Sequence, residues 1–364
     1  MQKMSLNSKI RHLVSLCLML AASCPALAES TDTLLFESDS LLELVMPVDF
    51  DTLCRPSQMP DCDYTATEFR YVDGEGVEHT IPISIRRRDG WRALQTNCQM
   101  PTLFVRFSKE DTVGTPFEGQ SFLALTSHCG KGISPENIPS RRMPDRFETY
   151  VINEYLGYRL NNLITDISLR VRPVRIKYIH PENPRETFTH YAFFAEHFES
   201  LARRFHAQLL PAQSFDPDRL DLGAADQLAV FQYMIGHTDW SISIQDNIIL
   251  LSFPDGKHVP VVFDLDLTGL VNAFYARPAP HLPINSVVQR YYLGYCHDDT
   301  DWDGLFAKFN AQRDNIMALV DEIPGLGGGD RRRAGAYLES FFKIIESERA
   351  RRNGIINACQ PFPS

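Results

Sequence analysis

A basic excess and long apolar segments are both missing from the body of this 364-residue sequence. Its 36 lysine and arginine residues face 46 aspartate and glutamate residues, a formal net charge of −10. A general nucleic-acid binder needs surplus positive charge to neutralise phosphates, so we expect no nucleic-acid partner. After residue 28 no apolar run approaches the roughly 20 residues that span a bilayer, so we expect no transmembrane span in the mature chain.

The sequence also lacks the short motifs of several enzyme classes. It contains no Walker phosphate loop, no GxSxG serine elbow, no HExxH zinc helix and no CxxC pair. P-loop nucleotide hydrolases, α/β-type serine hydrolases and zinc metalloproteases are therefore not predicted. What is present, 44% hydrophobic and 23% charged residues, is typical of a folded globular protein.

The first 28 residues have the pattern of a secretory signal peptide. Three basic residues precede the apolar run Leu13–Ala22, and the small residues Ala26 and Ala28 match a signal-peptidase site. We predict cleavage after Ala28 and a periplasmic or secreted protein. Removing the three basic residues leaves 33 against 46 acidic ones, a net charge of −13. Lipid attachment at Cys24 is an alternative, although position 21 lacks the usual bulky aliphatic residue.

Six of the eight cysteines remain after that cleavage, an even set that an oxidising compartment can pair. Six cysteines allow 15 connectivities, and the sequence does not choose among them. Cys54 with Cys62 and Cys98 with Cys129 are the pairs that are plausible from their spacing. The remaining two are Cys296 and Cys359.

Short runs rich in β-branched and aromatic residues follow, separated by turn residues, and they predict antiparallel strands. These runs are Thr80–Ile85, Leu103–Phe107, Phe122–Leu125, Leu169–Ile179 and Thr187–Phe194. Between the third and the fourth run, Asp145 and Glu148 have the spacing of a capping box. This spacing predicts a helix from Asp145 to about Leu163.

The second half of the sequence predicts mostly helices. Apolar residues at helical spacing indicate helices near 196–209, 224–236, 305–320 and 331–352. After a signal peptide at 1–28, we therefore predict an α+β fold of two lobes. Residues 29–144 would form a β-rich N-terminal lobe, and residues 145–364 a helix-rich C-terminal lobe with a β-hairpin at 247–266.

That hairpin segment concentrates oxygen-bearing side chains. If the turn at 254–257 is a two- or four-residue loop, paired residues have numbers that sum to 511, and Asn247 lies directly opposite Asp264. Asp266 then lies on the diagonal, and the three side chains can hold one hard divalent cation. Aspartate and asparagine are common in turns, which would explain any one of these residues. That preference explains less well why two carboxylates lie within the apolar stretch Val261–Leu267. A three-residue loop would break the pairing.

Asp239 precedes the first strand of the hairpin, where it can reach the rim of the same site. A loop aspartate, a following asparagine and an aspartate after a hairpin are the parts with which protein kinases position a hydroxyl group and bind Mg-ATP. The segment therefore predicts phosphoryl transfer, with Mg²⁺ or Mn²⁺ and ATP as cofactors.

At these residues the chain resembles the CotH-like (spore coat protein H) atypical kinases. The aspartate, the following asparagine and the paired aspartates of that family match Asp239, Asn247 and the pair Asp264 and Asp266. The resemblance implies a two-lobed protein-kinase-like fold over about residues 80–320. It also implies that Asp239 orients or deprotonates the acceptor, while Asn247 and Asp264 bind metal and nucleotide.

The sequence departs from the kinase pattern near the nucleotide. Asn247 follows Asp239 by eight residues rather than five, and no Gly-rich nucleotide loop is present. No ATP-contacting lysine is identified, and the possible substitutes are Arg92, Arg106, Lys109 and Lys131. The basic run Arg86–Arg88 precedes them.

The resemblance also implies a lobe-bridging glutamate on the helix that begins near Asp145. We prefer Glu154, which shares a helical stripe with Val151 and Tyr158 and needs a cationic partner if it faces inward. Glu148 is better explained as a helix cap.

The acidic segment Asp299–Asp303 matches the first half of an EF-hand loop. The twelfth position of that loop is Asn310, where a calcium site expects a bidentate glutamate. We interpret the segment as an acidic lead-in to a helix and leave calcium binding open.

These patterns predict an exported phosphotransferase that acts on an unknown protein or small-molecule acceptor. Two alternatives remain. One is a catalytically silent kinase-like protein that binds a partner of the cell envelope, and the other is a metal-dependent phosphohydrolase in which water replaces the acceptor.

Overall fold

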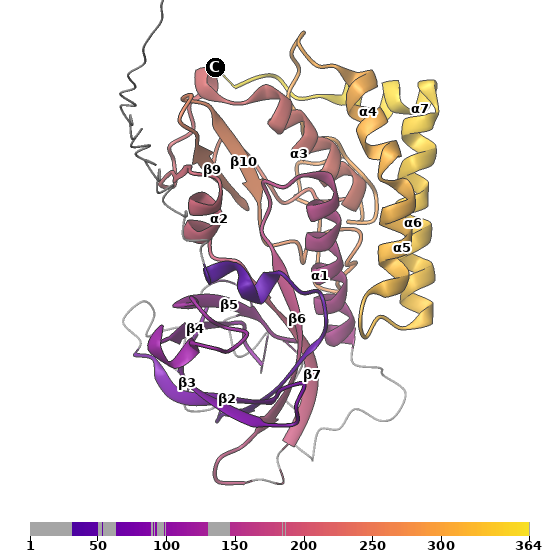
Figure 1. The fold of residues 1–364 in the computed structure, drawn as a ribbon. Coiled ribbons are helices and arrows are strands. Elements are labelled where there is room, and N and C mark those ends of the chain that lie inside the picture. The colour runs from indigo at the N-terminus through magenta and orange to yellow at the C-terminus, as the bar shows by residue number, and fades with distance from the viewer. Residues whose placement is uncertain are drawn as a thin grey trace, which may run out of the picture. The chain divides into compact units, whose positions relative to one another are not determined.

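Seven strands close into a β-barrel, in the order β1-β2-β3-β4-β5-β7-β6 (Figure 1). The structure is a computed structural model that describes residues 31–49, 53, 63–88, 90, 92, 98, 100–129, 146–183, 185 and 187–363. The strands are β1 (Leu42–Pro47), β2 (Thr65–Val72), β3 (Glu78–Arg87), β4 (Leu103–Phe107), β5 (Phe122–Thr126), β6 (Val171–Ile179) and β7 (Thr187–Ala195). The predicted signal peptide, the predicted Cys54–Cys62 pair, Asp145 and Lys131 lie outside the described residues.

Alternating side chains fill the inside of the barrel. On β4, for example, Leu103, Val105 and Phe107 are buried while Arg106 between them is exposed. The five strands predicted from the sequence are confirmed as β3 to β7. The barrel core includes Phe69, Ile83, Ile85, Val105, Leu123, Ile176 and Phe194.

A parallel pairing between β1 and β6 completes the barrel. Leu44 pairs with Ile176, whereas all other neighbouring strands of the barrel are antiparallel. β1 precedes the first predicted strand, and β6 follows the helix that we predicted from Asp145. The strands of the barrel therefore come from both sides of that helix.

This closure corrects the predicted fold class. We expected an α+β, two-lobed protein-kinase-like fold with a β-rich N-terminal and a helix-rich C-terminal lobe, and that prediction is wrong. The structure has one closed, mixed seven-stranded barrel with helices. The physical reason is that the β1–β6 pairing joins segments about 130 residues apart, and local strand patterns carry no information on such a contact.

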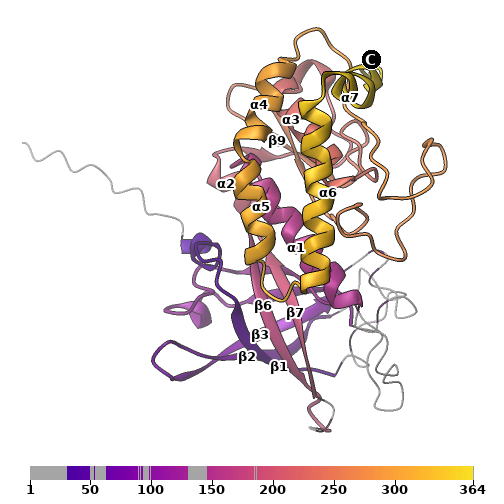
Figure 2. The same ribbon diagram turned by 90° about the vertical axis from the view of Figure 1, so that its right-hand side faces the viewer.

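Seven α-helices occur in the described part of the chain. They are α1 (Arg146–Ile164), α2 (Phe198–Arg204), α3 (Leu222–Ile235), α4 (Trp302–Ala311), α5 (Arg313–Glu322), α6 (Gly328–Glu346) and α7 (Glu348–Gly354). α1 packs on β7 and α5, and α5 lies beside α6 (Figure 2). A second sheet has the order β10-β9-β8, with β8 at Gln208–Leu209, β9 at Ile248–Ser252 and β10 at His258–Val262.

α1 is buried on almost all sides. Nearly every side chain from Tyr150 to Leu160 is buried, including Asn153 and Glu154. The helix therefore has no single apolar stripe, and Glu154 lies in the interior because the whole helix does.

Helix α3 ends at a glycine that directs the chain toward the hairpin. Gly236 has a left-handed backbone, with φ of 68°, and closes the helix by donating to the carbonyls of Gln232 and Tyr233. A Cβ at this position would lie 2.0 Å from the hydroxyl oxygen of Tyr337, so only glycine fits. The predicted end of this helix is confirmed.

Two disulfides occur among the described residues, Cys98–Cys129 and Cys296–Cys359. The first confirms the pairing proposed from spacing, and the second links residues 63 positions apart. None of the described helices has the length and apolar character needed to cross a membrane.

Candidate active site

The loop after α3 brings Asp239 against Asn247. The side-chain amide of Asn247 donates to the carbonyl oxygen of Asp239 at 2.7 Å and to its carboxylate at 3.3 Å. Trp240 holds the same loop, because its indole N–H donates to the carbonyl of His237 at 3.1 Å. With its amide nitrogen engaged, Asn247 has its side-chain oxygen as the group that can bind a cation.

The hairpin register differs from the predicted one. Ile248 pairs with Val262, so paired residues have numbers that sum to 510 rather than 511, and Asn247 accepts from the backbone N–H of Phe263. The prediction that Asn247 lies directly opposite Asp264 is therefore wrong. The cause is the loop, which holds three residues, 254–256, with Gly256 at a φ of 86°.

Left-handed backbone geometry nevertheless brings Asn247 and Asp264 to one pocket. In a regular hairpin of this register the two side chains would project from opposite faces. Both residues have a positive φ, 51° for Asn247 and 56° for Asp264, which takes each of them out of the strand alternation. Asparagine and aspartate are the residues other than glycine that adopt this conformation most readily. The backbone of Asp264 is held by donation to the hydroxyl of Tyr158 at 2.8 Å.

Three acidic side chains surround one arginine beside this hairpin. Arg92 donates to Glu154 at 2.8 Å and to Asp264 at 2.6 Å, and its Nε lies 3.5 Å from Asp266. The side chains of Arg92 and Glu154 are only 8% and 2% exposed, so their contact is shielded from water, whereas the side chain of Asp264 is 38% exposed and reaches the pocket. Tyr275 completes the cluster by donating its hydroxyl proton to Asp266 at 3.0 Å.

Arg92 is therefore the cation that meets Glu154, and the other described candidates lie elsewhere. The guanidinium of Arg106 stands 3.8 Å from the ring centre of Tyr64 on the barrel. Lys109 precedes a short 3₁₀ helix at Glu110–Thr112. Arg92 and the acidic residues are far apart in the sequence. Spacing along the chain therefore could not show which of the four basic candidates contacts Glu154.

A pocket of about 420 Å³ contains all of the predicted carboxylates and the asparagine except Glu154, which lies behind Arg92. The barrel side and its connecting segments contribute Arg88, Gly90, Arg92 and Thr102, and the other wall contributes Asp239, Asp246, Asn247, Asp264, Asp266, Leu267, Tyr275 and Arg277. The sequence analysis missed Thr102, Asp246, Tyr275 and Arg277, and no motif pointed to them. The pocket thus combines oxygen ligands with guanidinium groups.

The carboxyl groups of the pocket differ in the direction of their pKa shifts. Burial raises the pKa of Asp266 to about 7, although Arg92 opposes that shift. Burial would also raise the pKa of Asp264, but Arg92 and Arg88 outweigh it and hold that pKa below its usual value. Burial raises the pKa of Asp239, and the nearby carboxylates of Asp246 and Asp264 raise it further. Asp264 is the carboxylate most ready to bind a cation, and Asp239 is a stronger base than an ordinary aspartate.

No group of three His, Cys, Asp or Glu side chains among the described residues is arranged to hold a metal ion as it stands. Arg92 occupies the space between Glu154, Asp264 and Asp266 instead. Three carboxyl groups thus meet one guanidinium, with Arg88 also acting on Asp264, and such a cluster can offer oxygen ligands to a divalent cation once Asp266 is ionised.

Other features singled out in the sequence have structural roles. Asp301 caps α4 by accepting from the backbone N–H of Gly304, as an acidic helix lead-in does. Glu148 accepts from the backbone N–H of Tyr191 on β7, so it ties α1 to the barrel. His197 caps α2.

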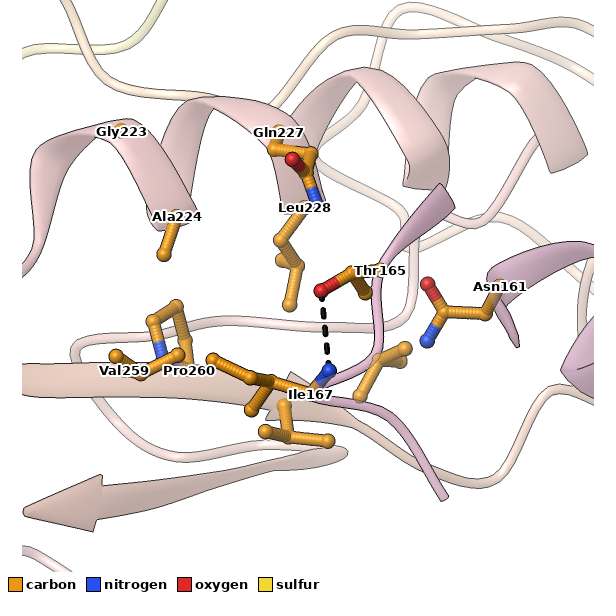
Figure 3. Close-up of a pocket in the computed structure, with 11 residues that line it drawn as sticks. Asn161, Thr165, Ile167, Gly223, Ala224, Gln227, Leu228, Val259 and Pro260 are labelled. Carbon is orange, nitrogen blue, oxygen red and sulfur yellow. Dashed lines mark hydrogen bonds between the residues drawn. The ribbon is translucent and has the colours of Figure 1, made fainter. Parts of the chain in front are cut away.

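A second, smaller pocket of about 210 Å³ lies where the end of α1, the start of α3 and β10 meet (Figure 3). Its walls are mostly apolar, with Ile167, Leu228 and Val259 among them. Asn161 is 6% exposed, and Figure 3 shows its amide without a hydrogen bond to the residues drawn.

Replacing Asn161 by leucine should change the free energy of unfolding by less than about 1 kcal/mol, because its amide lines the pocket and makes no hydrogen bond to the other residues that line it. The neighbouring Asn162 is the matched control, since its amide donates to Ser168 and to the carbonyl of Leu169. Asn162→Leu should lower stability by about 1–3 kcal/mol. Denaturant unfolding of both variants measures the contrast, and equal losses would show that Asn161 is bonded.

No protein-family model matches this chain, and no curated protein matches it. Among solved structures, the crystal structure of the Helicobacter pylori proinflammatory kinase CtkA is similar, with a TM-score of 0.33 and 8% sequence identity. The similarity covers 71% of this chain and 89% of that chain. These comparisons do not show the CotH-like family, so that resemblance stays a prediction.

Proposed function

We propose that this protein is an exported phosphotransferase that moves a phosphoryl group from a nucleotide, bound with Mg²⁺ or Mn²⁺, to a hydroxyl group of an acceptor. The observation that carries the proposal is the meeting, in one pocket, of Asp239, Asn247 and Asp264 with Arg88 and Arg92. Phosphoryl transfer needs this combination of oxygen ligands for a cation, positive groups for phosphate oxygens and a base for the acceptor.

The proposed roles follow from the environment of each side chain. Asn247 and Asp264 would bind the divalent cation with Asp266, and the cation would supply charge neutralisation for the phosphates. Arg88 and Arg92 would face the phosphate oxygens, because a guanidinium matches their geometry. Glu154 is buried against Arg92 and would keep that side chain in place.

Asp239 would serve as the base. The acceptor oxygen would attack the terminal phosphorus and lose its proton to Asp239, while the bond to the nucleoside diphosphate breaks. The raised pKa of Asp239, caused by its burial and then by Asp246 and Asp264, supports this role because a stronger base removes the proton more readily.

Export is part of the proposal. The two disulfides, Cys98–Cys129 and Cys296–Cys359, support it, because disulfides persist in oxidising compartments. The phosphate donor in such a compartment is left open.

The decisive test is a thermal-unfolding titration of the mature chain with Mn²⁺, ATP and both together. Binding to the folded state raises its stability by about 2.7 kcal/mol at a hundred times Kd, which shifts the unfolding temperature upward. We expect the shift to require both ligands and to disappear in Asp264→Asn.

Asp255→Asn is the control for that titration, because Asp255 lies in the hairpin turn, is exposed and lines no part of the pocket. A shift that persists in Asp264→Asn would contradict the assignment. The absence of any shift in the unmodified protein would favour the silent, partner-binding alternative. In a further titration inorganic phosphate replaces ATP beside Mn²⁺, and a shift of the same size there would favour the phosphohydrolase.

A further inference from the structure

Arg92 stands where the proposed cation would have to approach its ligands. Its Nη2 lies 2.6 Å from the Oδ1 atom of Asp264, and its Nε lies 3.5 Å from the Oδ2 atom of Asp266. The arginine is thus an internal cation shared by both aspartates, and its side chain is only 8% exposed.

A divalent cation bound by the two aspartates would lie within a few ångströms of this guanidinium. Two positive groups so close repel each other, and water screens this repulsion only in part because the side chains of Arg92 and Asp266 are only 8% and 10% exposed. Asp264 cannot keep its short contact with Arg92 and also bind the ion at full strength. Glu154, in contrast, contacts Arg92 through both of its carboxylate oxygens and can keep hold of it.

A phosphate group changes this balance. Arg92 and Arg88 line the same pocket as Asp264, so an anion in the pocket would draw the guanidinium and offset its repulsion with the metal. Binding of the phosphate group then favours binding of the cation, and binding of the cation favours binding of the phosphate group.

We infer that Arg92 is a gate that couples the two ligands. In the ligand-free protein it holds Asp264 and Asp266, it has to release Asp264 before a divalent cation binds, and a phosphate-bearing ligand favours that release. The cation and the phosphate therefore bind with positive cooperativity, and by linkage each raises the affinity for the other by the same factor. This inference rests on the metal site of the proposed function.

The test is Mn²⁺ binding to the mature protein, followed by the electron paramagnetic resonance signal of free Mn²⁺, with and without inorganic phosphate. Coupling of this kind amounts to about 5- to 150-fold in affinity. In the unmodified protein we expect phosphate to raise the Mn²⁺ affinity by at least about tenfold. In Arg92→Gln we expect Mn²⁺ alone to bind at least about tenfold more tightly than it does to the unmodified protein, with the effect of phosphate lost.

Arg277→Gln is the matched control. Arg277 lines the same pocket, but its guanidinium donates to the backbone carbonyls of Phe274 and Ala276 and, among the described residues, to no carboxylate. Its removal takes away the same charge and should change the affinity for Mn²⁺ alone by less than about threefold, since it blocks no ligand. Arg92→Lys covers the case in which the glutamine variant does not fold, because its single ammonium group cannot span Glu154 and Asp264 at once. It should also bind Mn²⁺ more tightly than the unmodified protein.

Two results would overturn the gate in different ways. If Mn²⁺ binds the unmodified protein, but a folded Arg92 variant binds it no more tightly, Arg92 is a structural partner of Glu154 and the proposed function stands. If Mn²⁺ binds to none of the proteins under any condition, the metal site fails and the gate fails with it.

Discussion

Replacing Asp239 by asparagine should lower the rate of phosphoryl transfer by about 10²- to 10⁴-fold, the usual contribution of a positioned general base. Asparagine retains an oxygen that can accept from Asn247, so the loop should keep its shape while the group that takes the proton is lost. Release of nucleoside diphosphate from Mg-ATP measures the rate. The thermal shift caused by Mn²⁺ with ATP should remain, because Asp239 is not one of the proposed metal ligands.

The pH profile gives this prediction a second readout. Asp239 acts as a base only when ionised, so the rate should rise with pH through the pKa of this carboxyl group. Burial, and next the carboxylate of Asp246, raises that pKa. Asp246→Asn should therefore move the acidic limb of the profile to lower pH and lower the maximal rate somewhat, because a less basic carboxylate removes the proton less readily. An Asp239→Asn protein with full activity would remove Asp239 from the mechanism.

Asp266→Asn should stabilise the metal-free protein at neutral and basic pH. The pKa of Asp266 is raised to about 7 by burial, against about 3.9 for an unfolded aspartate. The unfolded chain therefore loses this proton at lower pH than the folded protein, and the folded state loses stability as the pH rises from about 4 to about 7. At about 1.4 kcal/mol per unit, the full penalty is on the order of 4 kcal/mol, and the asparagine variant avoids it.

Denaturant unfolding in the presence of a chelator, at pH values from 5 to 8, measures this effect. The stability gained by Asp266→Asn should grow with pH and level off above about pH 7. Asp255→Asn, in the exposed hairpin turn, should show no such trend. A gain that is the same at every pH would mean that Asp266 is already ionised in the folded protein. The expected trend would show that this site is destabilising by itself, which is common where a binding site keeps unbalanced charge for its ligand.

The loop between β9 and β10 shows which features of the site local sequence patterns predict and which they do not. The sequence indicated a hairpin with oxygen-bearing residues at both of its open ends, and the structure contains it. The number of residues in the turn decides the register, and Pro254, Asp255 and Gly256 form a three-residue loop where the prediction needed two or four. The two residues still line one pocket, because Asn247 and Asp264 adopt left-handed backbone that strand alternation does not anticipate.

The sequence by itself determined the elements whose cause is local. It indicated five barrel strands from their residue types, a helix from Asp145 to about Leu163 where the structure has α1, the end of α3 at Gly236 and the pairing of Cys98 with Cys129. The signals are alternation, capping, the left-handed helix end that glycine favours and, for the disulfide, the modest spacing of the two cysteines. It also named Asp239, Asn247, Asp264 and Asp266, which line a single pocket in the structure.

Tertiary structure alone decided the contacts between distant segments. The parallel pairing of β1 with β6 closes the barrel and replaces the predicted two lobes, and Cys296 pairs with Cys359. Arg92 meets Glu154 and Asp264 across separations of 62 and 172 residues. Such contacts depend on how the strands and helices pack against one another. Residue type and spacing along the chain do not determine which basic side chain will contact which carboxylate. Arg92, which we propose as the gate, was therefore one of four candidates in the sequence. Only its contacts with Glu154 and Asp264 in the folded protein distinguish it from the others.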